Sequence, residues 1–168
     1  MNNYKEIVNI YKNNFVFKND SNAPRLEYDF ESIKQLFENY ACSDFAFACH
    51  KATGWKVFQF DISNMDDEEY PPYHVAVQNP DTKMFFDING YSKKEDIIKK
   101  YNGNIEYSDC YEIKPSQMLV YDERQIEIIS NLAKDILKNI DKEMIKKINT
   151  DMKNLTSSKI KRSFGKYL

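Results

Sequence analysis

The segment "YHVAVQNPDTKMFFDING", residues 73–90, contains two strand-like runs joined by turn-forming residues. The runs "YHVAVQ" and "KMFFDI" flank the sequence "NPDT", and a second turn follows at Asn89-Gly90. Alternating apolar residues on both sides of a short turn are typical of a β-hairpin. The segment therefore predicts two antiparallel strands around which the rest of the chain is arranged.

The length of the hairpin loop predicts which residues face each other. A loop of Pro80-Asp81, or of residues 79–82, places His74 directly opposite Asp87. Directly opposed residues share one face of a sheet, with Cβ atoms about 4.5–5.5 Å apart. A slip of one residue would send one partner to the other face. The opposite face would be filled by apolar side chains: Val75, Val77, Met84, Phe86 and Ile88.

A short helix is expected before the hairpin, in "CSDFAFACHKATGW", residues 42–55. Ser43 and Asp44 offer N-cap chemistry, and Gly54 supplies a C-terminal stop. Cys42 would lie at the start of this helix, on its apolar face. The apolar positions recur at helical spacing: Phe45, Ala48, Cys49 and Ala52.

The remaining elements complete an α+β fold. Apolar periodicity predicts helices near residues 3–17 and 28–40 and a long C-terminal helix. The other expected elements are strands in "WKVFQFDI" and "EYSDCYEI" and a short helix in "SKKEDIIKKY". We expect one domain over residues 1–168, with a small antiparallel sheet packed against the cysteine-bearing helix. Its core would cover about residues 28–121, and the C-terminal helix and basic tail residues 122–168.

Composition excludes several classes of function. The chain has four glycines, so neither a Walker loop nor a dinucleotide fingerprint can be written. No apolar run has the length of a membrane span, and the N-terminus does not resemble a signal peptide. Three cysteines, an odd number, indicate free thiols in a reducing compartment. These features predict a cytoplasmic protein without a membrane anchor.

Charge is unevenly distributed along the chain. Residues 61–70, "DISNMDDEEY", carry acids and no base, whereas the tail from Lys142 onward is basic. A solvated helix face and a frayed end are the simplest explanation of such runs. If the acidic segment, which precedes His74, borders a site, it favours a basic partner there.

Cys42, His74 and Asp87 form the candidate catalytic set. A thiol at a helix start is in a position that favours the thiolate, because unpaired N–H groups and the helix dipole stabilise negative charge. A thiolate nucleophile needs an imidazole, and the imidazole needs an acceptor that orients it. Cys49 lies inside the same helix, where no free N–H awaits it, and is interpreted as an inert core thiol.

The motifs "CSDFAFACHKATGW" and "HVAVQNPDTKMFFDING" resemble the Cys-His-Asp core of papain-like and transglutaminase-like cysteine enzymes, NlpC/P60-type peptidases included. They are similar in particular to small bacterial and phage proteins with a Cys-helix ending in "TGW", an "HV-V" strand and a "YLD-x-x-G" strand. In that set, as here, a "DCYEIKPSQ"-like strand and a C-terminal helix follow. The resemblance covers roughly residues 38–138. If the chain is encoded by a phage, we expect the protein in the cytoplasm of the host cell.

The resemblance implies a role for each member of the set. Cys42 would be the nucleophile, His74 the general base and acid, and Asp87 the group that orients His74. The reaction would be attack on an amide or thioester carbonyl of a protein or peptide, followed by hydrolysis or transfer to an amine. Peptidase, deamidase, amidase and transglutaminase reactions share these steps, and none needs a cofactor.

Three further residues are candidates for contact with the substrate. Residues before the cysteine often supply an oxyanion donor in these enzymes, and Gln35 and Asn39 occupy that part of the chain. Trp55, the only tryptophan, follows the cysteine-bearing helix. These residues are the expected oxyanion or substrate-binding groups.

Two other chemistries would use the same cysteines. A metal site would recruit Cys42, Cys49, His50 and Cys110, but the spacing C-x6-C-H matches no zinc pattern, and adjacent helix residues point to different faces. A disulfide between Cys42 and Cys49 would have to span about 10 Å. Neither a metal nor a disulfide is therefore expected.

The competing class of function is a binding protein on a cysteine-enzyme scaffold, since fold does not imply function. Such a protein would act as an inhibitor or effector through its acidic body or its C-terminal helix. Nucleic acid is a disfavoured partner, because only two aromatic residues, Phe164 and Tyr167, lie among the cations of the basic tail, and no recognition motif is present. The cations in question are Lys159, Lys161, Arg162 and Lys166.

Overall fold

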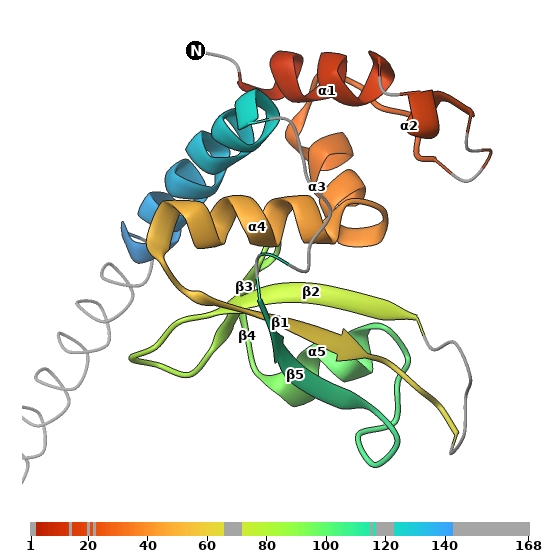
Figure 1. Ribbon diagram of the computed structural model, residues 1–168, viewed down its shortest axis with the longest axis vertical. Helices are drawn as coiled ribbons and strands as arrows, with labels where there is room; N and C mark the ends of the chain where they lie inside the picture. The colour runs from red at the N-terminus through yellow and green to blue at the C-terminus, as the bar shows by residue number, and fades with distance from the viewer. Residues whose placement is uncertain are drawn as a thin grey trace, which may run out of the picture. The chain divides into compact units, whose positions relative to one another are not determined.

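The structure is a computed structural model that describes residues 3–13, 15–19, 21, 23–65, 72–114, 116 and 123–142. The chain divides into two compact units, residues 1–134 and residues 135–168. The first unit holds an antiparallel sheet with helices before and after it (Figure 1). A long helix over residues 123–142 follows the last strand. The predicted α+β class is confirmed.

The helices lie close to the predicted positions, with one difference at the N-terminus. The single helix expected there is two helices, and Asn13 ends the first one, in line with the low helix propensity of asparagine. The labelled helices are α1 (Asn3–Asn13), α2 (Phe15–Asn19), α3 (Phe30–Asn39), α4 (Cys42–Thr53) and α5 (Lys94–Lys100).

Five strands form one antiparallel sheet in the order β4-β3-β2-β1-β5. β2 lies at the centre, between β1 and β3, so the strand that carries His74 has neighbours on both sides. The strand β4, which directly follows β3, was not predicted. The strands are β1 (Lys56–Asp61), β2 (Tyr73–Gln78), β3 (Phe85–Asp87), β4 (Gly90–Ser92) and β5 (Asp109–Ile113).

Both faces of the sheet are covered by helices (Figure 1). On the α4 side, Phe86 contacts Phe45 of α4, with ring centroids 6.1 Å apart. Neighbouring residues of a strand point to opposite faces, so Phe85 lies on the other side, in a cluster with α5. The buried members of this cluster are Phe60, Ile62, Ala76, Phe85, Ile97 and Ile98.

The predicted register of the hairpin is wrong by two residues. Val77 pairs with Phe86, whereas the predicted register places Val77 opposite Met84. His74 and Asp87 are consequently not in direct opposition. Because the shift is an even number of residues, both remain on one face of the sheet, as diagonal neighbours within reach of each other.

The hairpin loop explains this shift. The backbone N–H of Asn79 donates to the carbonyl of Met84 at 3.0 Å, so the loop covers residues 80–83 and not residues 80–81 or 79–82, the two loops expected. The side-chain oxygen of Asn79 accepts the N–H groups of Asp81 (2.9 Å) and Thr82 (3.2 Å). This side-chain cap closes the turn after Asn79 and leaves Asn79 itself in the ladder.

The C-terminus of α4 is built as predicted. Gly54 follows Thr53 in the left-handed conformation, with φ of 74°, and its N–H donates to the carbonyl of His50 at 2.7 Å. Nδ1 of His50 lies 2.7 Å from the carbonyl oxygen of Trp55, so this histidine closes the end of the helix.

The N-terminus of α4 differs from the prediction. The N-cap residue is Ala41, which makes no side-chain cap hydrogen bond, whereas Ser43 and Asp44, which were expected to cap the helix, lie inside its first turn. Asp44 lies within the first turn, where its buried carboxylate accepts hydrogen bonds from the hydroxyl of Tyr11 and from the amide of Gln125. These tertiary partners hold the carboxylate that the sequence assigned to capping.

Candidate active site

The candidate catalytic residues come from three elements of the unit formed by residues 1–134. Cys42 is the first residue of α4, His74 lies near the start of β2, and Asp87 ends β3. All three side chains are buried, with exposed fractions of 9%, 1% and 6%. Figure 1 shows that α4 and β2 begin on the same side of the molecule, which brings the nucleophile and the histidine to one end of the layered structure.

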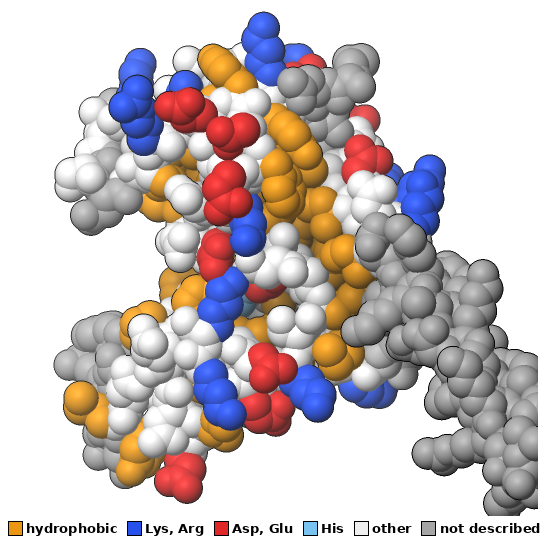
Figure 2. Space-filling view, turned by 180° about the vertical axis from the view of Figure 1, so that it is seen from behind, with side chains coloured by type: hydrophobic (Ala, Val, Ile, Leu, Met, Phe, Trp, Pro, Cys, Tyr) orange, Lys and Arg blue, Asp and Glu red, His pale blue; other side chains and the backbone are white. Residues whose placement is uncertain are grey.

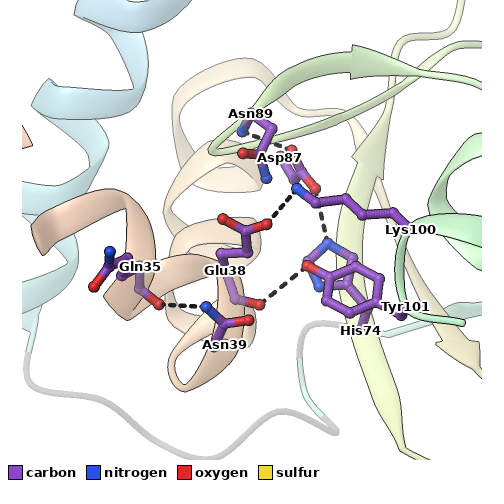
Figure 3. A network of polar contacts seen from close by, with 8 residues as sticks. All are labelled: Gln35, Glu38, Asn39, His74, Asp87, Asn89, Lys100 and Tyr101. Carbon is purple, nitrogen blue, oxygen red and sulfur yellow. Dashed lines mark hydrogen bonds and ion pairs between the residues drawn. The ribbon is translucent and has the colours of Figure 1, made fainter. Parts of the chain in front are cut away.

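His74 and Asp87 are joined by a short, buried contact (Figure 3). Nε2 of His74 lies 2.9 Å from Oδ2 of Asp87. The other carboxylate oxygen, Oδ1, accepts the backbone N–H of Asn89 at 2.7 Å. Because both oxygens have a donor, the carboxylate is held in one orientation and directs the imidazole ring.

The second ring nitrogen of His74 is the one available to the thiol. Nδ1 is buried and has no hydrogen-bond partner of normal geometry among the described residues. The Cys42 thiol nevertheless lies close enough to influence the protonation of the ring. Hydrogen bonds between catalytic groups are often long or poorly aligned before a substrate binds.

His74 is held in its charged form. Burial lowers the pKa of His74, but the hydrogen bond to Asp87 and the neighbouring side chains of Asp87 and Cys42 raise that pKa to about 9. At neutral pH the ring is therefore an imidazolium between a carboxylate and a thiol.

The other two cysteines lack this environment. Burial, and then the nearby charge of Asp87, raise the pKa of Cys49 well above its usual value. Burial raises the pKa of Cys110 to about 11. Both thiols are protonated at neutral pH, which agrees with the interpretation of Cys49 as an inert core residue.

Two tyrosines near the site had no signal in the sequence. The ring of Tyr101, which follows α5, stacks on the ring of His74, with centroids 4.7 Å apart and an interplanar angle of 29°. Its hydroxyl donates to the carbonyl of Glu38 at 3.1 Å (Figure 3). Tyr73 directly precedes His74 and is more than half exposed. The burial of the remainder of the residue, and then the charges of Cys42 and Asp44, raise its pKa.

The candidate substrate-contact residues are not brought into this group. Gln35 and Asn39 are exposed on α3; the amide of Asn39 donates to the carbonyl of Gln35 at 3.4 Å, and the side chain of Gln35 points away from His74 (Figure 3). Trp55 follows the opposite end of α4 from Cys42, and this helix is about 18 Å long at 1.5 Å per residue. Its ring contacts Phe86 and Tyr91 instead.

The surface beside the site is hollowed, and cavities also occur elsewhere. Figure 2 shows a recess between the helices and the sheet on the side where α4 and β2 begin. A cavity of about 660 Å³ lies near α2 and a second of about 570 Å³ near α1; neither is lined by Cys42, His74 or Asp87. Within the described ranges, no three histidine, cysteine or acidic side chains are grouped to hold a metal ion.

No protein-family model matches the chain, and no curated protein or solved structure matches it. In the part of the chain that the structure describes, every helix is too short or too polar to cross a lipid bilayer.

Proposed function

We propose that the protein is a cysteine-dependent acyl-transfer enzyme that acts on an amide or thioester carbonyl through Cys42, His74 and Asp87. The observation that carries the proposal is the buried His74–Asp87 pair beside a thiol at a helix N-terminus. The resemblance of the surrounding motifs to papain-like and transglutaminase-like enzymes supports the same reading, because it assigns these residues the same roles.

The first half-reaction forms a thioester. The Cys42 thiolate attacks the carbonyl carbon, and the carbonyl oxygen becomes an oxyanion. The N–H groups of Asp44 and Phe45 donate to the Ala41 carbonyl, so the backbone N–H of Cys42, at the first position of α4, is the donor expected for this charge. The His74 imidazolium gives its Nδ1 proton to the leaving amine or thiolate as the bond to the carbonyl carbon breaks.

The second half-reaction releases the acyl group. Neutral His74 accepts a proton from water, or from an acceptor amine, as the oxygen or nitrogen attacks the thioester carbonyl. The carbon–sulfur bond breaks, the acid or new amide leaves, and the thiolate–imidazolium pair is restored. Asp87 holds the Nε2–H in place in both halves, so that Nδ1 always faces the chemistry.

A protein or peptide is the substrate class that the surface favours. The recess in Figure 2 leads to the side of the molecule where α4 and β2 begin. Tyr73 lies at this end of β2 with 59% of its side chain exposed, and we expect its ring to contact the substrate. Residues 66–70 of the acidic segment lie outside the described residues, so its preference for a basic partner stays a prediction. The free cysteines favour a cytoplasmic, reducing location.

Selective alkylation tests the proposal. We expect iodoacetamide at neutral pH to modify Cys42 much faster than Cys49 or Cys110, as mapped by peptide mass spectrometry. The selectivity should disappear in His74→Ala, because the thiolate loses its counter-ion. The two other cysteines act as internal controls. Slow and equal labelling of all three thiols in the unmodified protein would overturn the proposal.

The second candidate is a binding protein without catalysis. The cavity of about 660 Å³ near α2 favours it, because Cys42 does not line this cavity and three cations, Lys12, Lys18 and Arg25, lie in its lining against one acid, Glu27. Such a site would suit an acidic partner. Binding that survives Cys42→Ala but is lost when Lys18 and Arg25 are both changed to Glu would favour this candidate over the enzyme.

A further inference from the structure

Two adjacent residues at the end of α5 both bind Glu38, near the end of α3. Nζ of Lys100 lies 2.5 Å from Oε1 of Glu38, and the hydroxyl of Tyr101 donates to the Glu38 carbonyl at 3.1 Å (Figure 3). Glu38 is only a few residues before Cys42, the first residue of α4. These contacts therefore tie α5 to the part of the chain that delivers the nucleophile.

The ring of Tyr101 also covers His74. The two rings are nearly parallel, with an angle of 29° and centroids 4.7 Å apart. On β1, the ring of Phe60 lies 6.5 Å from the His74 ring. An imidazolium has a favourable interaction with an aromatic face, and a flat ring laid over it restricts rotation about its side-chain bonds.

We propose that Tyr101 is a positioning residue, which holds the His74 ring against Asp87 and aligns it with Cys42. This inference rests on the proposed acyl-transfer function. The stacked ring keeps His74 in the orientation in which Nε2 meets the carboxylate. The Tyr101 hydroxyl binds the Glu38 carbonyl near the end of α3. Tyr101 therefore contacts both His74 and the segment that leads to Cys42.

Among the described residues, few titratable groups face His74, so the pKa of His74 measures how its ring is oriented. They are Asp87 from β3, Cys42 from α4 and the Tyr101 hydroxyl, whose own pKa is raised by burial and by the charges of Asp87, Glu38 and Cys42. If the Tyr101 ring is lost, His74 can turn away from Asp87 and Cys42. The pKa of His74 should then be closer to about 6.5, the usual value for histidine.

Two variants separate the ring from the anchor. Tyr101→Phe keeps the stacked ring and removes the hydrogen bond to Glu38, whereas Tyr101→Leu removes both. Tyr107→Leu is the matched control, because Tyr107 is exposed and makes no ring contact with His74. Each protein is examined for its His74 titration by NMR with labelled histidine, and for the pH profile of Cys42 alkylation by iodoacetamide.

We expect the His74 midpoint to move to lower pH in both Tyr101 variants, further in Tyr101→Leu. A move of one pH unit corresponds to about a tenfold change in the protonation equilibrium. Alkylation of Cys42 at neutral pH should slow about tenfold in Tyr101→Leu and about threefold in Tyr101→Phe. Tyr107→Leu should match the unmodified protein. A role in folding alone would lower stability without moving either pH profile.

The inference is overturned if a folded Tyr101 variant keeps both the His74 midpoint and the Cys42 profile of the unmodified protein. If Tyr101→Leu does not fold, Tyr101→Phe decides, since it retains the half-buried ring. Failure of the proposed function is a different result: the unmodified protein then shows no selective reaction at Cys42, whereas the His74 midpoint still tests the role of Tyr101.

Discussion

His74 keeps its proton because the effect of its partners, Asp87 and Cys42, outweighs the cost of burial. Removal from water disfavours the charged ring, while Asp87 at 2.9 Å and the nearby Cys42 thiol stabilise it, and the balance places its pKa at about 9. A buried charge is tolerated only when it is paired in this way. The reactivity expected of Cys42, at the start of α4, therefore depends on the carboxylate of Asp87 at the end of β3.

Asp87→Asn tests that dependence at a single residue. The amide oxygen can still accept the Nε2–H, so the contact with the ring can persist, while the negative charge and the hydrogen bond from the Asn89 N–H are lost. We expect the pKa of His74 to fall and the alkylation of Cys42 at neutral pH to slow about tenfold, since one pKa unit corresponds to a factor of ten. The measurement is the second-order rate constant with iodoacetamide.

Asp81→Asn is the control for this substitution, because Asp81 lies in the exposed hairpin loop away from the site. It should leave the rate constant unchanged. A rate for Asp87→Asn equal to that of the unmodified protein would show that the carboxylate charge does not support the thiolate.

The cysteine-bearing helix depends on its two ends in different ways. In its first turn, Asp44 has tertiary contacts with Tyr11 and Gln125, and the N-cap residue Ala41 makes no side-chain cap hydrogen bond. Its last turn is closed by Gly54, whose φ of 74° lies in the region that L-residues with a Cβ avoid. The end remote from Cys42 thus provides a way to change stability without touching the site.

Gly54→Ala should destabilise the protein by about 1 kcal/mol, through backbone strain alone. A Cβ at this position would meet no atom within 4 Å, so no steric clash adds to the cost. Gly54→Asn should cost less, because asparagine tolerates the left-handed conformation. Urea unfolding measures both differences.

The rate of Cys42 alkylation should be the same in both folded Gly54 variants as in the unmodified protein. Equal stability of Gly54→Ala and the unmodified protein would contradict the strain argument. So would an asparagine variant that is as unstable as the alanine variant.

At the scale of the whole molecule, the raised pKa of His74 links folding to pH. The folded protein holds this proton up to about pH 9, whereas the unfolded chain releases it near 6.5, the usual value for histidine. The stabilising contribution is fully present below pH 6.5 and is lost as the pH rises through about 9. A shift of this size corresponds to about 3 kcal/mol.

Unfolding of the unmodified protein and of His74→Gln at pH 6 and at pH 9.5 measures this contribution. Cys110 and Tyr101 also have raised pKa values, so both proteins should lose stability in the alkaline range. The difference between the two proteins isolates His74: the advantage of the unmodified protein should be larger at pH 6 than at pH 9.5. The same advantage at both pH values would show that His74 is not charged in the folded protein.

Local chemistry in the sequence was sufficient for the class of fold and for several boundaries. Strand periodicity identified β2 and placed β1 and β3 within a few residues, and Gly54 marked the end of α4, because turn-forming residues and glycine act on their immediate neighbours. The face shared by His74 and Asp87 was also predictable. An error of two residues in register preserves the face, since side chains alternate with a period of two.

The register itself and the surroundings of the site depend on contacts that the linear pattern does not contain. Asn79 shifted the pairing by capping its own turn. Trp55 was a candidate by its closeness in sequence to the cysteine-bearing helix, yet it lies at the wrong end of that helix. Tyr101 had no local signal at all, because its partners His74 and Glu38 are distant in sequence and meet it only when α3, α5 and the sheet pack together. Periodicity and turn chemistry are local properties of the chain, so the sequence alone determined most of the elements and the sheet face shared by His74 and Asp87. The protonation and orientation of His74 arise from groups on other elements, and only the tertiary structure could decide them.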